Sequence, residues 1–354
     1  MPKRLPVTVI TGFLGAGKTT LLRHLLTQSG QRLAVMVNEF GSVGLDGDLI
    51  RSCGFCPEDE MEGRLVELNN GCLCCTVQDD FLPTMQRILS GSSHLDGIVV
   101  ETSGLALPMP LIEALNWPEI RTKIYLNGVV TLVDGEAIAA GSPVGDMSAL
   151  QKQREDDPSL DHLTPVNELF ADQLTAADFI LVSRADCLSS SQLTKIEHEI
   201  RNKSKIGTPL LCISHGQVDS ELILGLKSDN FNEPNNYKII SDDHEHQHNH
   251  LKVTSSTVRI ERPIDRSEIE TLLPKLALKY QILRLKGRCW LAGKAMPLQL
   301  QMVGPRLSSW FESAPETAWT PKKNGLDLVI LSLIDGAAEE MYELIERNGC
   351  FSKN

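Results

Sequence analysis

A glycine-rich segment near the start of the chain has the residue types and spacing of a phosphate-binding loop. Gly12, Gly17, Lys18 and Thr19 fit the pattern G-x-x-x-x-G-K-[ST], between an apolar run and a helical pattern. In such loops backbone N–H groups point at the phosphates, the lysine reaches the β- and γ-phosphates, and the threonine hydroxyl ligates Mg²⁺. The segment predicts a site for a nucleoside triphosphate and Mg²⁺, formed by Gly12, Gly15, Ala16, Gly17, Lys18, Thr19 and Thr20.

A second segment supplies an acidic residue for such a site. Residues 96–104 read DGIVVETSG, an apolar strand that ends at Glu101 and is followed by Gly104. We expect Glu101 to act on Mg²⁺ through a water molecule, and Gly104 to lie near the γ-phosphate.

A third segment, FILVSRAD over residues 179–186, indicates the nucleobase. Guanine-binding proteins carry N/S/T-K-x-D here: the aspartate accepts hydrogen bonds from guanine N1 and N2, and the lysine stem packs on the ring. Ser183, Arg184 and Asp186 occupy this pattern, with arginine in place of lysine. Because an arginine stem also covers a base plane, the segment favours guanine.

Three thiols within four residues form a candidate metal site. Cys72, Cys74 and Cys75 lie in the segment NNGCLCCT, in a loop predicted between a strand and a helix. Thiolates are soft ligands that suit Zn²⁺, Co²⁺, Cu⁺ or Ni²⁺. Cys72 and Cys74 share one side of an extended segment, and the start of a helix lowers the pKa of Cys75. Metal binding is therefore favoured over buried cysteines or a redox pair, with a remaining ligand from Glu39, the nucleotide or water.

The other cysteines and the histidines give weaker signals. Cys53 and Cys56 form a single C-x-x-C pair, which would bind metal, form a disulfide or do neither. The isolated cysteines are expected to be packed residues: Cys187, Cys212, Cys289 and Cys350. Four histidines alternate with polar residues and would be either auxiliary metal ligands or part of a solvated linker: His244, His246, His248 and His250.

Composition limits the classes of partner. The 354 residues carry 34 Lys+Arg against 46 Asp+Glu, a formal net charge of −12. This balance argues against nucleic acid as the main partner, because phosphate binding needs a basic surface. No run approaches the roughly 18 apolar residues of a membrane span, and the N-terminus lacks the apolar core of a secretory signal. We therefore expect no membrane association and a cytoplasmic location, where reducing conditions keep the thiols free.

Apolar runs alternate with helical patterns over residues 1–226. The runs are nearly continuous in apolar residues, as in strands buried on both faces: 5–10, 33–37, 65–68, 97–100, 128–133, 179–182 and 210–213. The alternation predicts an α/β, P-loop NTPase-type domain with a mostly parallel sheet. Residues 227–251 are polar and His-rich, and are interpreted as a linker.

A smaller α+β domain is predicted over residues 252–354. Strand patterns cover residues 253–260, 282–285, 289–292, 298–303 and 326–333, and helical patterns cover residues 266–278 and 335–346. No residue in this domain indicates a chemistry, so we expect it to dock a partner.

The chain resembles the CobW family of P-loop GTPases, metallochaperone-type proteins related to the nickel-insertion GTPases of hydrogenase and urease maturation. The resemblance spans nearly the whole chain and rests on the ordered segments GFLGAGKT, NEFG, GCLCC, ETSG and SRAD. RIERP, from Arg259, and KGRCW, from Lys286, are similar to the family's C-terminal domain. CGFCPED and ELFADQL are most similar to the branch linked to cobalamin biosynthesis, whereas Arg184 departs from the family's usual lysine.

The resemblance implies a GTP-hydrolysing metallochaperone. GTP and Mg²⁺ would order the segments around Glu39 and the cysteine loop, which would then hold a metal through Cys72 and Cys74, with Cys75 as an alternative or additional ligand. Co²⁺ is the favoured cargo. Hydrolysis would release it to a recipient protein such as a cobaltochelatase. Lys18, Thr19 and Glu101 would carry catalysis, with Glu39 as a candidate for positioning the attacking water. The sequence is compatible with an oligomer and does not specify one.

Three alternatives stay open. A zinc chaperone of the same family is one, because thiolate ligands accept Zn²⁺ readily. A P-loop kinase or ATPase acting on a small molecule is another, and a preference for ATP would support it. The third is a non-catalytic metal store, against which the intact phosphate loop argues.

Overall fold

A computed structural model of the chain describes residues 4–37, 65–67, 81–91, 94–156, 164–225 and 253–348. Contacts divide the chain into two compact units, Pro2–Leu224 and Gly225–Asn354. In the described part, no helix combines the length and the apolar character that crossing a membrane requires.

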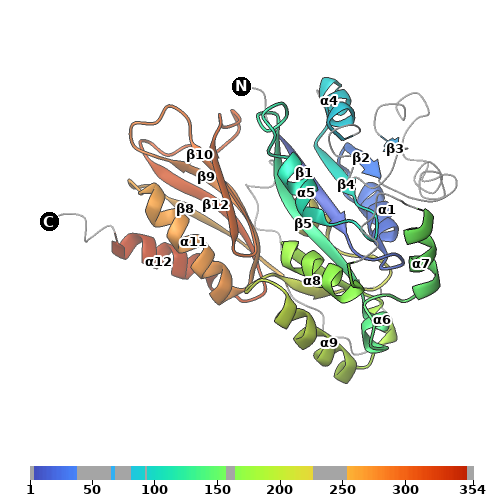
Figure 1. Cartoon of the computed structure of the whole chain (residues 1–354). Coiled ribbons are helices and arrows are strands. Elements are labelled where there is room, and N and C mark those ends of the chain that lie inside the picture. Colours follow the sequence, from blue (N-terminus) through green and yellow to red (C-terminus); the bar gives the residue numbers. More distant parts are fainter. Residues whose placement is uncertain are drawn as a thin grey trace. The chain divides into compact units, whose positions relative to one another are not determined.

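A seven-stranded parallel sheet forms the centre of the unit Pro2–Leu224 (Figure 1). The strand order is β3-β2-β4-β1-β5-β6-β7. The strands are β1 (Leu5–Thr11), β2 (Leu33–Val37), β3 (Leu65–Glu67), β4 (Gly97–Glu101), β5 (Ile124–Asp134), β6 (Phe179–Ser183) and β7 (Leu210–Cys212). The predicted fold class is confirmed. Strand β5 begins at Ile124 rather than Gly128, because Ile124 already pairs with Leu5 before a register shift at Val7/Thr8.

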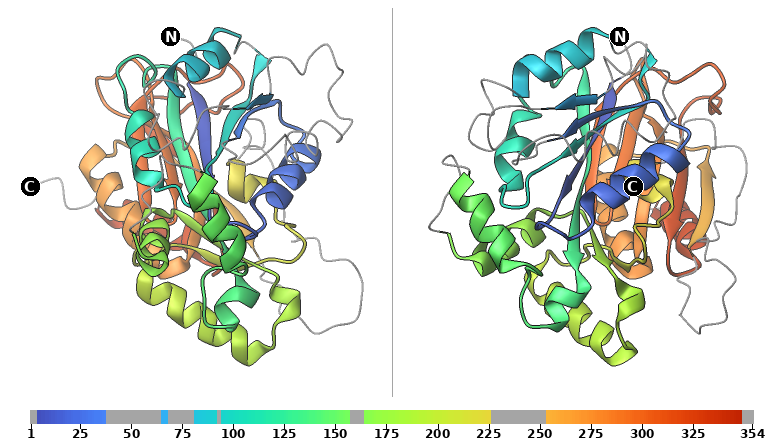
Figure 2. Two further views of the ribbon diagram at one scale, coloured as in Figure 1. Left: turned by 45° about the vertical axis from the view of Figure 1, so that its right-hand side comes forward. Right: turned by 90° about the vertical axis from the view of Figure 1, so that its right-hand side faces the viewer.

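Helices cover both faces of this sheet (Figure 2). Val9 and Ile10 are neighbours on β1 and point to opposite faces, and neither is exposed to solvent. One apolar cluster joins β1, β2 and β4 to helices α4 and α5, and another joins β5 and β6 to α8 and α9. The helices in the described residues of this unit are α1 (Lys18–Gln28), α4 (Leu82–Ser90), α5 (Pro108–Ala114), α6 (Gly135–Ala139), α7 (Met147–Asp156), α8 (Val166–Ala176), α9 (Ser190–Lys203) and α10 (Ser220–Leu224), with a short 3₁₀ turn, η3 (Ala185–Cys187).

The unit Gly225–Asn354 contains a five-stranded antiparallel sheet with two helices on one face (Figure 1). The strand order is β11-β10-β9-β12-β8. Alternate residues of β12, Leu326, Leu328 and Ile330, pack with Leu273 of α11 and Met341 of α12. The elements are β8 (Thr254–Ile260), α11 (Arg266–Tyr280), β9 (Ile282–Trp290), β10 (Leu298–Val303), β11 (Arg306–Phe311), β12 (Gly325–Ser332) and α12 (Ala337–Asn348).

One strand prediction in this second sheet is wrong, and one strand was not predicted. The sequence predicts two short strands around the polar triplet that starts at Lys286, but β9 is continuous. Arg288 is buried in the strand, and a Cβ at Gly287 would lie 2.0 Å from the carbonyl oxygen of Asp327, so only glycine allows this approach. Strand β11 was not predicted, because every one of its residues is half-buried and its serines give no apolar pattern.

Candidate functional site

The predicted phosphate loop connects the end of β1 to the start of α1. Gly12, Gly15 and Gly17 all have positive φ angles, of 135°, 80° and 99°. At Gly12 a Cβ atom would lie 2.3 Å from the carbonyl oxygen of Leu132 on β5, so glycine is required there. The N–H of Ala16 closes a turn on the carbonyl oxygen of Phe13 at 3.1 Å. These glycines give the loop the backbone course that the sequence motif predicts.

Lys18 and Thr19 lie where the loop becomes helix α1. The ammonium group of Lys18 is largely buried, and its Nζ donates a hydrogen bond to the carbonyl oxygen of Phe13 at 3.2 Å. Helix α1 starts at Lys18 after Gly17, which provides no side-chain cap. The start of a helix is suited to phosphate oxygens, because its first N–H groups point away from the helix and its dipole favours negative charge.

Glu101 lies beside this loop because β4 and β1 are adjacent parallel strands. Glu101 is the last residue of β4, pairs with Ile10 in the sheet register, and is 4% exposed. The next residue, Thr102, donates its N–H to the carbonyl oxygen of Ile10 at 2.9 Å. Its hydroxyl donates to the hydroxyl oxygen of Thr11 at 3.0 Å. The fold thus brings the predicted acidic residue to the edge of the sheet from which the phosphate loop starts.

Gly104 is packed directly against the phosphate loop. A Cβ atom at this position would lie 2.6 Å from the backbone nitrogen of Leu14 and 3.2 Å from the carbonyl carbon of Phe13. Because both neighbours are backbone atoms, they cannot move aside without moving the loop. The segment after Glu101 and the phosphate loop therefore form one packed unit.

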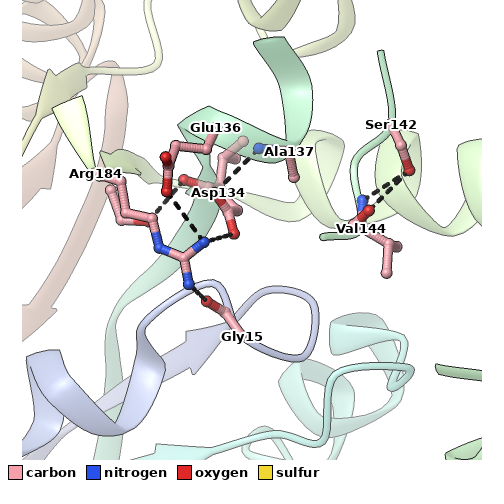
Figure 3. Close-up of polar contacts among 9 residues, drawn as sticks. Gly15, Asp134, Glu136, Ala137, Ser142, Val144 and Arg184 are labelled. Atoms are coloured by element: carbon pink, nitrogen blue, oxygen red, sulfur yellow. Dashed lines mark hydrogen bonds and ion pairs between the residues drawn. The ribbon is translucent and has the colours of Figure 1, made fainter. Parts of the chain in front are cut away.

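Arg184 connects the predicted base-reading segment to the phosphate loop (Figure 3). Its Nη2 donates a hydrogen bond to the carbonyl oxygen of Gly15 at 3.1 Å. Its Nη1 donates to Asp134 Oδ2 at 2.7 Å and lies 3.5 Å from Glu136 Oε2. The arginine that departs from the usual lysine is thus held by two carboxylates as well as by the loop.

Asp134 is a site residue whose role the sequence did not show. Its side chain is 4% exposed, and Oδ1 also accepts the N–H of Ala137 at 3.2 Å, which caps helix α6. It pairs in register with Ser183, next to Arg184. Its position at the end of a buried strand could have identified it, because residues at the carboxyl ends of neighbouring parallel strands lie close together.

Asp186 lies in the turn η3, close to the loop after β7. Its Oδ2 lies 3.7 Å from Nε2 of His215, whose side chain is 79% exposed. Gly216 packs against helix α1, since a Cβ there would lie 2.9 Å from Thr20 Cγ2. Ser183 donates its hydroxyl to the carbonyl oxygen of Val133 at 3.3 Å. The structure thus places Ser183, Arg184 and Asp186 at the same edge of the sheet as the phosphate loop.

The predicted transition-metal ligands lie outside the residues that the structure describes. This holds for Glu39, for the cysteines Cys72, Cys74 and Cys75, for the pair Cys53 and Cys56, and for the histidines His244, His246, His248 and His250. Cys350, predicted to be a packed residue, also lies outside them. Within the described ranges, no group of three or more His, Cys, Asp or Glu side chains is arranged to hold a metal ion.

The three described cysteines are free thiols. Cys289 is buried, as predicted, and Cys212 is partly buried. Burial raises the pKa of both to about 12, and Glu197 contributes to the raised pKa of Cys212. The prediction of a packed Cys187 is wrong, because Cys187 is exposed in η3, where the chain turns outward after β6. Thiols with raised pKa values stay protonated at neutral pH and are poor metal ligands.

Comparison with known proteins gives matches in both units. The family profile of the CobW/HypB/UreG nucleotide-binding domain matches residues 6–208, and that of the cobalamin synthesis protein CobW C-terminal domain matches residues 253–345. A Sinorhizobium protein named zinc chaperone CobW is 40% identical over 340 residues, 94% of each chain. A Pseudomonas aeruginosa protein of the same name is 40% identical over 312 residues, 87% of this chain and 83% of that protein. The zinc chaperone YjiA of Escherichia coli is 29% identical over 84% of this chain and 86% of that protein.

Proposed function

Because the chain belongs to the CobW/HypB/UreG family of nucleotide-binding proteins, we propose that it is a GTP-hydrolysing metal chaperone. In this proposal a transition metal binds the thiolates of Cys72, Cys74 and Cys75 in the Mg–GTP state and is released to a recipient protein after hydrolysis. The observation that best supports nucleotide binding is the contact of Arg184 with Gly15. That contact joins a base-reading segment to a phosphate loop.

The described residues suit a nucleoside triphosphate with Mg²⁺. The hydroxyl of Thr19 and the carboxylate of Glu101 are hard oxygen donors, which Mg²⁺ prefers, and Glu101 is buried beside the loop. Bound Mg²⁺ would neutralise charge on the β- and γ-phosphate oxygens. Lys18 would exchange its hydrogen bond to the Phe13 carbonyl for the phosphates. Glu101 would orient a water molecule of the metal's shell.

Guanine is the proposed base. In this proposal Asp186 would accept two hydrogen bonds from the guanine edge, and the stem of Arg184, which Asp134 and Gly15 hold, would cover the ring. Adenine offers no matching pair of donors to a carboxylate. This favours GTP hydrolysis over the alternative of an ATP-dependent kinase.

Zn²⁺ is the proposed cargo. The resemblance to the cobalamin branch favoured Co²⁺, but the relatives at 40% identity are named zinc chaperones, and thiolates bind zinc more tightly than cobalt in the Irving–Williams order. Direct competition between the two metals at the GTP-bound protein decides between them. If Co²⁺ prevails at cellular concentrations, a cobaltochelatase becomes the candidate recipient. Thiolate ligands require reducing conditions, so we place the protein in the cytoplasm.

Nucleotide binding and turnover test the enzymatic half of this proposal. The affinities of GTP and ATP would be measured with Mg²⁺, and inorganic phosphate would be followed during turnover. We expect a clear preference for GTP, slow release of inorganic phosphate, and loss of turnover in Lys18→Ala. A preference for ATP, or transfer of phosphate to an acceptor other than water, would contradict the proposal and support the kinase.

A further inference from the structure

Gln173 is a fully buried polar residue that contacts the loop after Glu101. It lies on α8, is 0% exposed, and its Nε2 donates to the carbonyl oxygens of Gly104 at 3.1 Å and Ala106 at 3.5 Å. Both neighbours are acceptors, so the amide must present its NH₂ group to them. The side-chain amide therefore holds two peptide groups of one short loop.

The same face of α8 also contacts the phosphate loop. Phe170 precedes Gln173 by three positions, which places both on one side of the helix. The ring of Phe170 lies 6.2 Å from the ring of Phe13, centroid to centroid. Helix α8 is further fixed to β5, because Thr131 donates its hydroxyl to the carbonyl oxygen of Gln173 at 3.1 Å. One helix face thus supports both loops that surround the phosphate site.

The loop between Glu101 and Ala106 is held at three points. Thr102 bonds the end of β1, Gly104 packs on the backbone of Leu14, and Gln173 bonds the carbonyl oxygens of Gly104 and Ala106. Thr102 and Gly104 belong to the loop, whereas Gln173 lies on α8. A substitution of Gln173 therefore removes one support and leaves the sequence of the loop unchanged. The orientation of the Gly104 peptide group thus depends on a residue outside the loop.

Only the NH₂ end of the Gln173 amide is hydrogen-bonded in the described part of the chain. Within the described part of the chain, Oε1 of Gln173 is buried and has no hydrogen-bond partner. An apolar residue of the same shape would carry no unsatisfied oxygen, but it would remove the donor to the carbonyl oxygens of Gly104 and Ala106. Two hydrogen bonds to carbonyl groups at a phosphate site give the amide a positioning purpose.

We propose that Gln173 is a positioning residue that sets the peptide orientation of the loop after Glu101 and thereby allows the protein to distinguish GTP from GDP. The inference rests on the proposed GTPase function, in which Gly104 lies near the γ-phosphate. GDP lacks that phosphate and depends on the phosphate loop and the base site. Loss of the Gln173 amide therefore weakens binding of GTP selectively.

Two variants remove the NH₂ donor in different ways. Gln173→Met replaces the amide with an apolar chain of similar length, and Gln173→Leu replaces it with a shorter apolar chain, so neither side chain can donate a hydrogen bond. Gln299→Met is the matched control, because Gln299 makes the same kind of bond, 2.9 Å to the carbonyl oxygen of Glu312, in the other compact unit. The Kd of GDP, the Kd of a non-hydrolysable GTP analogue, kcat, KM and the melting temperature would be measured for all four proteins.

We expect the affinity of the analogue and kcat to fall about tenfold in both Gln173 variants, with the affinity of GDP within about twofold of the parent. Gln299→Met should leave all nucleotide parameters unchanged. An equal loss of affinity for GDP and for the analogue, together with a lower melting temperature, would show that Gln173 is only a packing residue and would overturn the inference. An unchanged ratio of the two affinities would also overturn it. If Gln173→Met does not fold, Gln173→Leu decides. A parent that binds neither nucleotide would overturn the proposed function itself.

Discussion

The guanidinium group of Arg184 bridges the carbonyl oxygen of Gly15, at 3.1 Å, and the buried carboxylate of Asp134, at 2.7 Å. One hydrogen bond reaches the phosphate loop and the other reaches the end of β5. A lysine ammonium, as a point charge on a flexible stem, would not fix its own plane in this way. The carboxylate of Asp134 therefore makes arginine the better residue at this position.

Two substitutions of Arg184 test how far nucleotide binding depends on its guanidinium group. We expect Arg184→Ala to weaken binding of GDP and GTP about tenfold, because the loop and the base site both lose a contact. Arg184→Lys should lose no more than about threefold, since an ammonium still reaches Gly15. Calorimetric titration with GDP measures both variants. A loss in Arg184→Lys as large as that in Arg184→Ala would contradict this expectation, because it would show that an ammonium cannot replace the guanidinium fork.

Asp134→Asn tests the support of Arg184. Asparagine keeps an oxygen for the N–H of Ala137, so helix α6 stays capped, but the charge that holds Arg184 is lost. We expect guanine nucleotide affinity to fall about threefold with little change in melting temperature. Glu136→Gln is the control, because Glu136 is half exposed and lies 3.5 Å from the guanidinium, so it should change little.

Gly287→Ala should unfold the second unit selectively. Its Cβ would lie 2.0 Å from the carbonyl oxygen of Asp327 and 2.7 Å from Leu328 Cα, both backbone atoms of the adjacent strand. We expect a loss of more than about 3 kcal/mol in that unit, with GDP affinity unchanged. Gly293→Ala, where a Cβ meets nothing within 4 Å and only the positive φ is strained, should cost about 1 kcal/mol. Loss of GDP affinity in Gly287→Ala would show that the two units fold as one.

The described cysteines should be dispensable for metal binding. The pKa values of Cys212 and Cys289 are raised to about 12 by burial, and that of Cys187 is also raised. The triple variant Cys187→Ala/Cys212→Ala/Cys289→Ala should therefore keep the zinc stoichiometry of the parent at neutral pH. Metal analysis after gel filtration measures this. A lower stoichiometry would place a ligand among these three residues.

The pair Glu270 and Ser309 gives a pH-dependent contribution to stability. A 2.6 Å hydrogen bond from Ser309, with help from Arg266, lowers the pKa of Glu270 below its ordinary value of 4.5. Such a group stabilises the fold above pH 4.5 and loses this contribution as the pH falls through the folded pKa. Ser309→Ala should cost less than about 1 kcal/mol at pH 7, because Glu270 is a third exposed, and less still at acid pH. A cost in urea unfolding that grows as the pH falls would contradict this sign.

Most of the first sheet could be predicted from sequence, because strands buried on both faces are continuous apolar runs such as β2 and β6. In the second sheet the same reasoning failed at β9 and β11. The buried arginine Arg288 breaks the apolar pattern although its strand is intact, and β11 has an intermediate exposure along its full length. Periodicity reports burial of apolar residues and does not detect strands that bury charge.

The phosphate loop, Glu101 and the base-reading segment were also identified as candidates from the sequence, since their chemistry depends on local spacing. Asp134 and Gln173 were not, because each acts through a residue distant in the chain: Asp134 through Arg184, and Gln173 through Gly104. Only the parallel register of β5 with β6 and the packing of α8 bring these pairs together.

The central claim is that nucleotide state gates the metal site. The most direct measurement is the Zn²⁺ affinity of the anaerobic full-length protein with Mg²⁺ and either GDP or a non-hydrolysable GTP analogue, beside the Cys72→Ser/Cys74→Ser/Cys75→Ser variant. We predict at least about tenfold tighter binding in the analogue-bound state, a coupling of ordinary allosteric size, and its loss in the variant. Zn²⁺ affinity that is equal in both nucleotide states, or a gain that survives in the cysteine variant, would contradict the account.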